Sequence, residues 1–142
     1  MIRLSDIAAY LDYGCAIAEK DYERAKRDLF QCIEIVKEAG EIEKVTLLLQ
    51  FMGDTEQDMG NLSEALTYYQ KAEINAPDSP FARIKFAKFL ISRRADANAA
   101  MKKCDEAEEI LRDKWHPDPN DLTEEEYKRE INEIRNIGST RR

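Results

Sequence analysis

The chain has 142 residues, 43% of them hydrophobic and 36% charged, so it can bury one core without disulfides or metals and is too apolar for a disordered chain. Its formal net charge of −7 makes nucleic acid and anionic membrane surfaces poor partners, because phosphate groups are repelled. The chain has only five Gly and four Pro, too few for the many turns of a β-sandwich or barrel, so a helical fold is favoured. No apolar run reaches the roughly 18 residues of a membrane span, so no membrane segment is expected.

The first two helical patterns form a hairpin. Apolar residues recur at spacings of three and four from about Ser5 to Glu19, which places them on one face of a helix. A second pattern runs from Tyr22 to Ala39, and Gly40 can then take the left-handed conformation that ends a helix. The expected inner faces consist of Leu4, Ile7, Ala8, Leu11, Cys15 and Ala18 in the first helix and of Tyr22, Ala25, Leu29, Cys32, Ile33 and Val36 in the second.

The third and fourth patterns form a second hairpin. A third helix is expected from Val45 to Gly60. Asn61, with Glu64 three residues later, predicts a capping box that starts a fourth helix, and Pro77 stops that helix. The apolar stripe of the fourth helix consists of Leu62, Ala65, Leu66, Tyr69 and Ala72, with Ile74 as a further candidate member.

Capping signals mark the fifth and sixth helices. The Ser79 hydroxyl can cap a helix and Pro80 suits its first position, so a fifth helix is expected over residues 81–92. Asp96 predicts the cap of a sixth helix that continues to Lys114. Its stripe consists of Ala100, Cys104, Ala107 and Leu111, and its boundary within residues 93–99 is left open.

A seventh helix closes the chain. Thr123 and Glu126 are spaced as a capping box, three residues apart. The helix is amphipathic, and residues 138–142 are expected to be a frayed tail. Its apolar face carries Tyr127, Ile131 and Ile134.

The cysteines indicate neither a disulfide framework nor a metal site. Cys15, Cys32 and Cys104 lie far apart, form no C-x-x-C pair and have no histidine nearby in sequence. We therefore expect no metal, no cofactor and a reducing cytoplasm as the compartment. Cys32 and Cys104 are expected to be packing residues.

One segment repeats a known pattern. From Thr46 to Ser79, small and aromatic residues stand at defined spacings: Leu49, Met52, Gly53, Gly60, Ala65, Tyr69, Ala72 and Pro77. These positions, and the run GNLSEALTYYQKAEINAPDS, resemble the tetratricopeptide repeat. In this pattern Gly53 and Ala65 let two helices approach closely, and Tyr69 fills space between neighbouring repeats.

Looser matches before and after this segment extend the resemblance over most of the chain. They imply an all-α fold, a right-handed superhelical solenoid of three helical hairpins with a C-terminal capping helix. The expected organisation is a single domain over residues 1–142, with repeats over about 5–40, 41–79 and 80–117, a capping helix over about 121–137 and a tail over 138–142.

The resemblance implies a concave groove, lined by the first helix of each hairpin, that binds a peptide. A carboxylate clamp is not expected. Among the positions that match the clamp residues, only Lys85 has a side chain of suitable chemistry. An acidic patch beside a basic pair favours a peptide of mixed charge, although solvated charges without a partner explain the same pattern. The candidate groove residues are Asp12, Gln50, Phe51, Asp54, Gln57, Asp58, Phe81, Lys85 and Lys88, with Leu11 and Cys15 as positions that serve equally well for packing.

The expected function is therefore that of an adaptor that binds a protein or peptide. No phosphate loop or nucleophile elbow occurs, and the only histidine is His116, so neither an enzyme nor any catalytic residue is expected. One alternative is a self-associating module that pairs through an uncovered end of the array. A second is a co-chaperone, because His116, Pro117 and Asp118 match the loop triad of J-domain proteins; a Pro-Asx turn explains the same residues more simply.

Overall fold

The computed structural model describes residues 1–93, 96–117 and 121–141, and within these ranges the chain is entirely helical, without a strand. This confirms the all-α class expected from the sequence. The elements are a short 3-10 helix, η1 (Leu4–Asp6), and the α-helices α1 (Ala8–Ala18), α2 (Tyr22–Glu38), α3 (Ile42–Asp58), α4 (Leu62–Asn75), α5 (Pro80–Ser92), α6 (Ala97–Asp113) and α7 (Glu124–Arg141).

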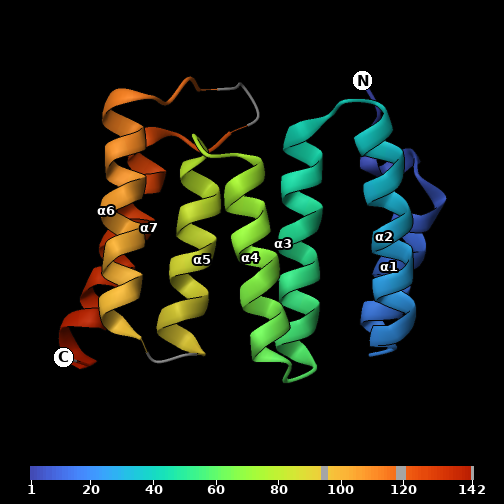
Figure 1. The fold of residues 1–142 in the computed structure, drawn as a ribbon, viewed down its shortest axis with the longest axis horizontal. Coiled ribbons are helices and arrows are strands. Elements are labelled where there is room, and N and C mark those ends of the chain that lie inside the picture. The colour runs from blue at the N-terminus through green and yellow to red at the C-terminus, as the bar shows by residue number, and fades with distance from the viewer. Residues whose placement is uncertain (94–95, 118–120, 142) are drawn as a thin grey trace. The chain divides into compact units, whose positions relative to one another are not determined.

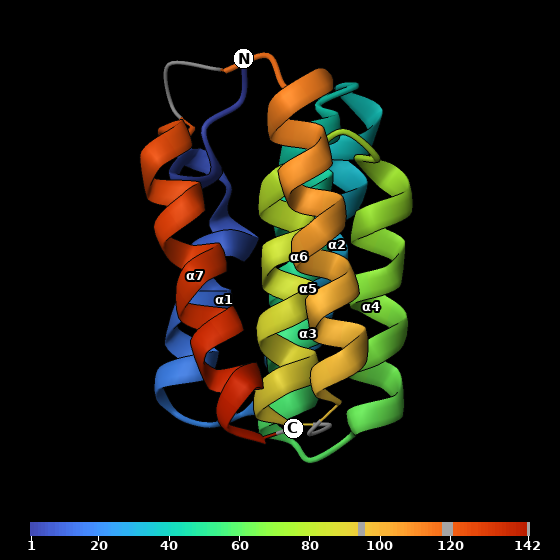
Figure 2. The ribbon, with the colours of Figure 1, turned by 90° about the vertical axis from the view of Figure 1, so that its left-hand side faces the viewer.

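The chain divides into two compact units, and each is described by itself. The N-terminal unit, Met1–Ala76, contains α1 to α4, and each of these helices packs on the next one along the chain (Figure 1). The C-terminal unit, Pro77–Arg142, contains α5, α6 and α7, and α7 packs on both of the others. In Figure 2, α6 and α7 lie nearest the viewer as two neighbouring helices of this unit.

Three helix ends in the N-terminal unit share one geometry. Lys20, Gly40 and Gly60, spaced 20 residues apart, all have positive φ, at 59°, 73° and 84°. The next amide in each case bonds a carbonyl five residues back, as in Asp21 N to Ala16 O at 2.8 Å, so each end is a Schellman-type closure. Gly40 was expected in this role, whereas Lys20 adopts the left-handed conformation without being glycine.

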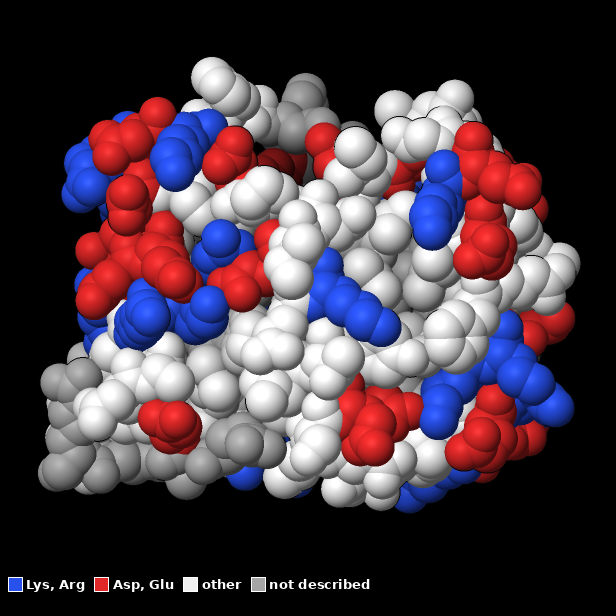
Figure 3. All heavy atoms as spheres, viewed as in Figure 1, with Lys and Arg blue, Asp and Glu red and all other residues white. Residues whose placement is uncertain are grey.

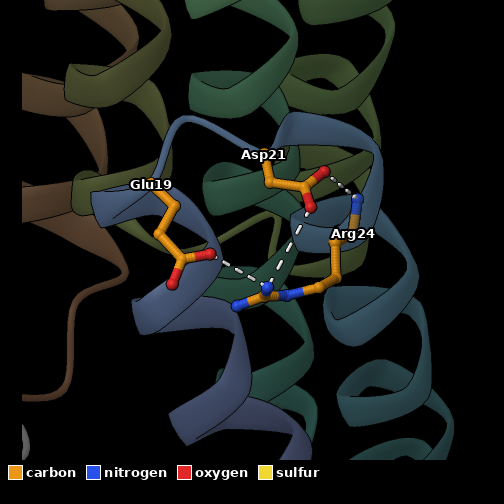
Figure 4. Close-up of polar contacts among 3 residues, drawn as sticks. All are labelled: Glu19, Asp21 and Arg24. Carbon is orange, nitrogen blue, oxygen red and sulfur yellow. Dashed lines mark hydrogen bonds and ion pairs between the residues drawn. The ribbon is translucent and has the colours of Figure 1, made fainter.

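The turn between α1 and α2 is fixed by charged side chains (Figure 4). Asp21 caps α2 by accepting a hydrogen bond from the Arg24 amide at 3.3 Å. The Arg24 guanidinium in turn binds Glu19 at 3.0 Å, joining the end of α1 to the first turn of α2.

The capping hydrogen bonds predicted from the sequence are confirmed at three helices, and the one predicted at a fourth helix is wrong. The hydroxyl of Ser79 and the carboxylate of Asp96 each accept an amide hydrogen bond, and Thr123 and Glu126 form the reciprocal capping box. Asn61 makes no capping hydrogen bond. Its side-chain nitrogen donates to Glu56 Oε2 at 3.1 Å, which turns the side chain toward α3, and its backbone amide donates to Glu56 O at 2.8 Å and is therefore not available to Glu64.

The predicted inner faces of α2, α6 and α7 are buried apart from the half-buried Tyr22. On α4, Ile74 is 78% exposed and does not belong to the inner face, and the face predicted for α1 is not buried either. The buried residues of α1 are Ala9 and Ala16, while Leu11 is 56% exposed and Cys15 is also exposed. Apolar residues surround this helix, so their spacing does not select one face. The small alanine side chains are the ones that let α1 lie close to α2.

Gly53 allows the close approach of α3 and α4 that the repeat pattern predicts. A Cβ atom at this position would lie 2.9 Å from Cε1 and Cζ of Tyr69, closer than real side-chain contacts. The Tyr69 ring therefore lies close to the backbone of α3 at Gly53, within its own hairpin, and its hydroxyl donates a hydrogen bond to Asp54.

The last helix is longer than expected. The backbone remains helical to Arg141, so residues 138–141 continue α7 where a frayed tail was predicted. Packing on α6 explains this extension, because Gly138 lies against the Met101 side chain and Arg135 binds both Asp105 and Glu108. The third helix likewise begins earlier than predicted, at Ile42.

Candidate peptide-binding surface

Three aromatic rings meet between α1 and α3. The ring centroids of Tyr10 and Tyr13 lie 6.5 and 5.8 Å from that of Phe51, and the two tyrosines are 6.1 Å apart. All three side chains are half-buried and pack against the core of the N-terminal unit. We call these three residues the aromatic cluster; its exposed ring surface can contact apolar groups or cations.

Asp54 places a fixed negative charge beside the aromatic cluster. Its carboxylate accepts a hydrogen bond from the Tyr69 hydroxyl, and Gln57 Oε1 lies 3.3 Å from the same hydroxyl. Burial, followed by the charge of Asp54, raises the pKa of Tyr13 to about 12. The same two causes raise the pKa of Tyr69, so both hydroxyls stay protonated at neutral pH.

Two more carboxylates extend the negative charge toward solvent. Asp58 is one helical turn beyond Asp54, so it belongs to the same stripe of α3, and its side chain is exposed. Asp12 is exposed on α1, between the two tyrosines in sequence. Neither makes an ion pair with any residue of the described ranges, so both charges are available to a partner.

The structure sorts the predicted groove residues into different environments. Gln50 is fully buried, and neither of its amide atoms has a hydrogen-bond partner among the described residues, so its side chain is not presented to a ligand. Phe51, Asp54 and Gln57 are brought together around Tyr13 and Tyr69. The exposed members of the N-terminal unit are Asp12, Asp58, Leu11 and Cys15.

The groove residues expected on the third hairpin all lie on α5, in the C-terminal unit. Phe81 and Lys85 are half-buried there. Lys88 is exposed and forms an ion pair with Glu130 of α7, so this helix partly neutralises the predicted basic pair.

The two tyrosines of the aromatic cluster were not predicted as site residues. Leu11 and Cys15 of the same helix were assigned to the groove from the repeat resemblance, and both are exposed. A Tyr-x-x-Tyr spacing, which puts two rings on one side of a helix, is the signal that identifies them.

Asp121, which precedes α7, accepts hydrogen bonds from residues on both sides of it in sequence. Trp115 Nε1 donates to its Oδ2 at 3.1 Å, and the Leu122 amide and the Tyr127 hydroxyl donate to its Oδ1. Trp115 also packs edge-on against the Tyr127 ring, with centroids 5.8 Å apart. His116 and Pro117 are exposed beside this network, and Asp118 of the predicted triad lies outside the described residues.

Comparisons with known proteins identify no family. The sequence matches no protein-family model and no curated protein. In the parts of the chain that the structure describes, no three His, Cys, Asp or Glu side chains are grouped as metal ligands. No helix of those parts has the length and hydropathy needed to cross a bilayer.

Proposed function

We propose that this chain is a tetratricopeptide-like solenoid that acts as an adaptor and binds a segment of another protein through the first helices of its hairpins. The proposal rests on the aromatic cluster formed by residues of α1 and α3, with Asp54 and Asp58 of α3 beside it. The regular closures at Lys20, Gly40 and Gly60 support a repeated architecture.

The chemistry of this surface favours a ligand segment that carries lysine or arginine. Half-buried tyrosine and phenylalanine rings attract cations through their faces, and Asp12 and Asp58 add two carboxylates without an ion-pair partner in the described ranges. Lys88 is occupied by Glu130, so we propose a basic segment in place of the mixed-charge peptide expected from the sequence.

The test uses the full chain and compares two matched charge reversals. A labelled arginine-rich peptide should bind the wild type, and Asp58→Lys should weaken this binding about tenfold, which is the effect of losing a favourable charge and gaining a repulsive one. Asp78→Lys makes the same change at an exposed position of the other unit and should leave binding unaltered. Equal affinity for both variants, or no binding to the wild type, would contradict the proposed basic ligand.

A second experiment asks whether a natural partner contacts the same surface. Benzoylphenylalanine placed at position 58 should crosslink, in native extract, to a protein segment that contains lysine or arginine. The same group at the exposed position of Gln31 on α2 is the control. Crosslinking to the same partner from position 31 and not from position 58 would show that binding does not use the α1 and α3 surface.

A further inference from the structure

An apolar pocket of about 350 Å³ opens on the N-terminal unit, between α2, α3 and α4. Ile33 and Val45 are nearly buried and Leu49 is half-buried, and together they form an aliphatic lining. Ile42 and Ile74 stand at its edge and are 59% and 78% exposed. Two large aliphatic side chains exposed beside one pocket are typical of a surface that meets an apolar partner group.

The pocket and the aromatic cluster are separate surfaces. Leu49, which lines the pocket, and Phe51, which belongs to the cluster, are two residues apart on α3 and so differ by about 200° around the helix axis. The two surfaces therefore lie on opposite sides of α3, and occupation of one leaves the other open.

The charges available at the pocket are basic, although the protein as a whole is acidic. Lys37 and Lys71 line the pocket and are exposed, and neither has a carboxylate partner in the described ranges; the Lys71 ammonium lies only over the Tyr68 ring, at 5.1 Å. Figure 3 shows this face, where uncharged surface extends between α4 and α2 and both basic and acidic side chains lie beside it.

The one acidic residue of the lining is already engaged. Glu41 accepts a hydrogen bond from the Ile2 amide at 2.8 Å and pairs with Lys44 at 3.0 Å. These contacts hold the pKa of the Glu41 carboxyl below its ordinary value, the Ile2 amide making the larger contribution, so its charge stays internally compensated. The Asn75 amide is likewise occupied, since it donates to Ile42 O and to Thr46 Oγ1.

We propose that this pocket is a second binding site, which takes an acidic protein segment whose aliphatic side chains enter between Ile42 and Ile74 while its carboxylates meet Lys37 and Lys71. The complementarity of charge selects this occupant over a second copy of the chain, because two chains of net charge −7 repel each other. A leucine or isoleucine on a helical segment matches the aliphatic lining and the open shape of the site.

Binding is tested with two labelled amphipathic peptides, one of leucine and glutamate and one of leucine and lysine. The wild-type chain should bind the glutamate peptide at least about tenfold more tightly than the lysine peptide, with an affinity that falls as salt is added. The double variant Lys37→Glu, Lys71→Glu should reverse this preference. Lys102→Glu, at an exposed position of the other unit, is the control for a single charge reversal away from the pocket and should preserve the preference.

The apolar half of the site is tested with Ile74→Ser, a change at an exposed position that should leave the fold intact. It should weaken binding of the glutamate peptide about tenfold or more, whereas Ile137→Ser, at a 43% exposed position of α7, should not. Sedimentation of the unliganded chain measures its oligomeric state independently of peptide binding. A dimer that Ile74→Ser dissociates would identify a second copy as the occupant and overturn the proposal, as would wild-type affinity in all pocket variants.

Discussion

The two helical glycines Gly14 and Gly53 should respond in opposite ways to replacement by alanine. Alanine favours a helix over glycine by about 1 kcal/mol, so Gly14→Ala, where a Cβ would meet nothing within 4 Å, should stabilise the protein by about 0.5 to 1 kcal/mol. At Gly53 the new Cβ would lie 2.9 Å from two atoms of the Tyr69 ring, so that ring must move by about 0.5 Å to restore ordinary contact.

The Tyr69 ring cannot move freely, because its hydroxyl is bonded to Asp54. Overpacking of this kind costs about 1 to 3 kcal/mol, and strain on a hydrogen bond to a charged group adds to that cost. The helix gain of about 1 kcal/mol offsets only part of it, so we expect Gly53→Ala to destabilise the fold by about 1 to 3 kcal/mol.

Urea unfolding followed by circular dichroism measures both effects. The midpoint should rise for Gly14→Ala and fall for Gly53→Ala, with the slope unchanged. In a double-mutant cycle, Tyr69→Phe should reduce the penalty of Gly53→Ala, because the ring is then released from Asp54. A Gly53→Ala protein as stable as the wild type would show that the tight packing of α3 on α4 does not exist.

Three further predictions concern the N-terminal turn, the response to alkali and thiol chemistry. Lys20→Gly should stabilise the fold by up to about 1 kcal/mol, because Lys20 occupies the left-handed region at φ 59°; a lower unfolding midpoint would refute this. Tyr13 has its pKa raised from 10.0 to about 12, so between these values the unfolded chain loses a proton that the folded chain keeps. Stability should therefore fall as pH rises above about 10, with a shallower fall in Tyr13→Phe, and equal pH profiles of unfolding for the two proteins would count against this. Of the cysteines, exposed Cys15 should react with a thiol reagent at once, while Cys32 and Cys104, whose pKa values burial raises to about 11, should react only on unfolding; mass spectrometry of the labelled chain distinguishes the sites.

The sequence by itself determined the helical elements and most of their ends. Signals such as Ser79 with Pro80, Asp96, and Thr123 with Glu126 act within one helical turn, so the residues that make the bond are neighbours in the chain. The inner faces of α2, α6 and α7 were also readable, because polar residues occupy their other sides and leave one apolar stripe.

Only the tertiary structure decided which surfaces the helices present. Asn61 has a capping side chain, but a hydrogen bond from its side-chain nitrogen to the buried Glu56 carboxylate turns it toward α3, and it forms no cap. The face of α1 depended on which residues were small enough to meet α2, and the aromatic cluster joins Tyr10 and Tyr13 to a ring some forty positions away. The apolar pocket likewise combines side chains of three helices. Local spacing fixes where a residue lies around its own helix, but partners distant in sequence fix whether that position is packed, bonded or open to a ligand.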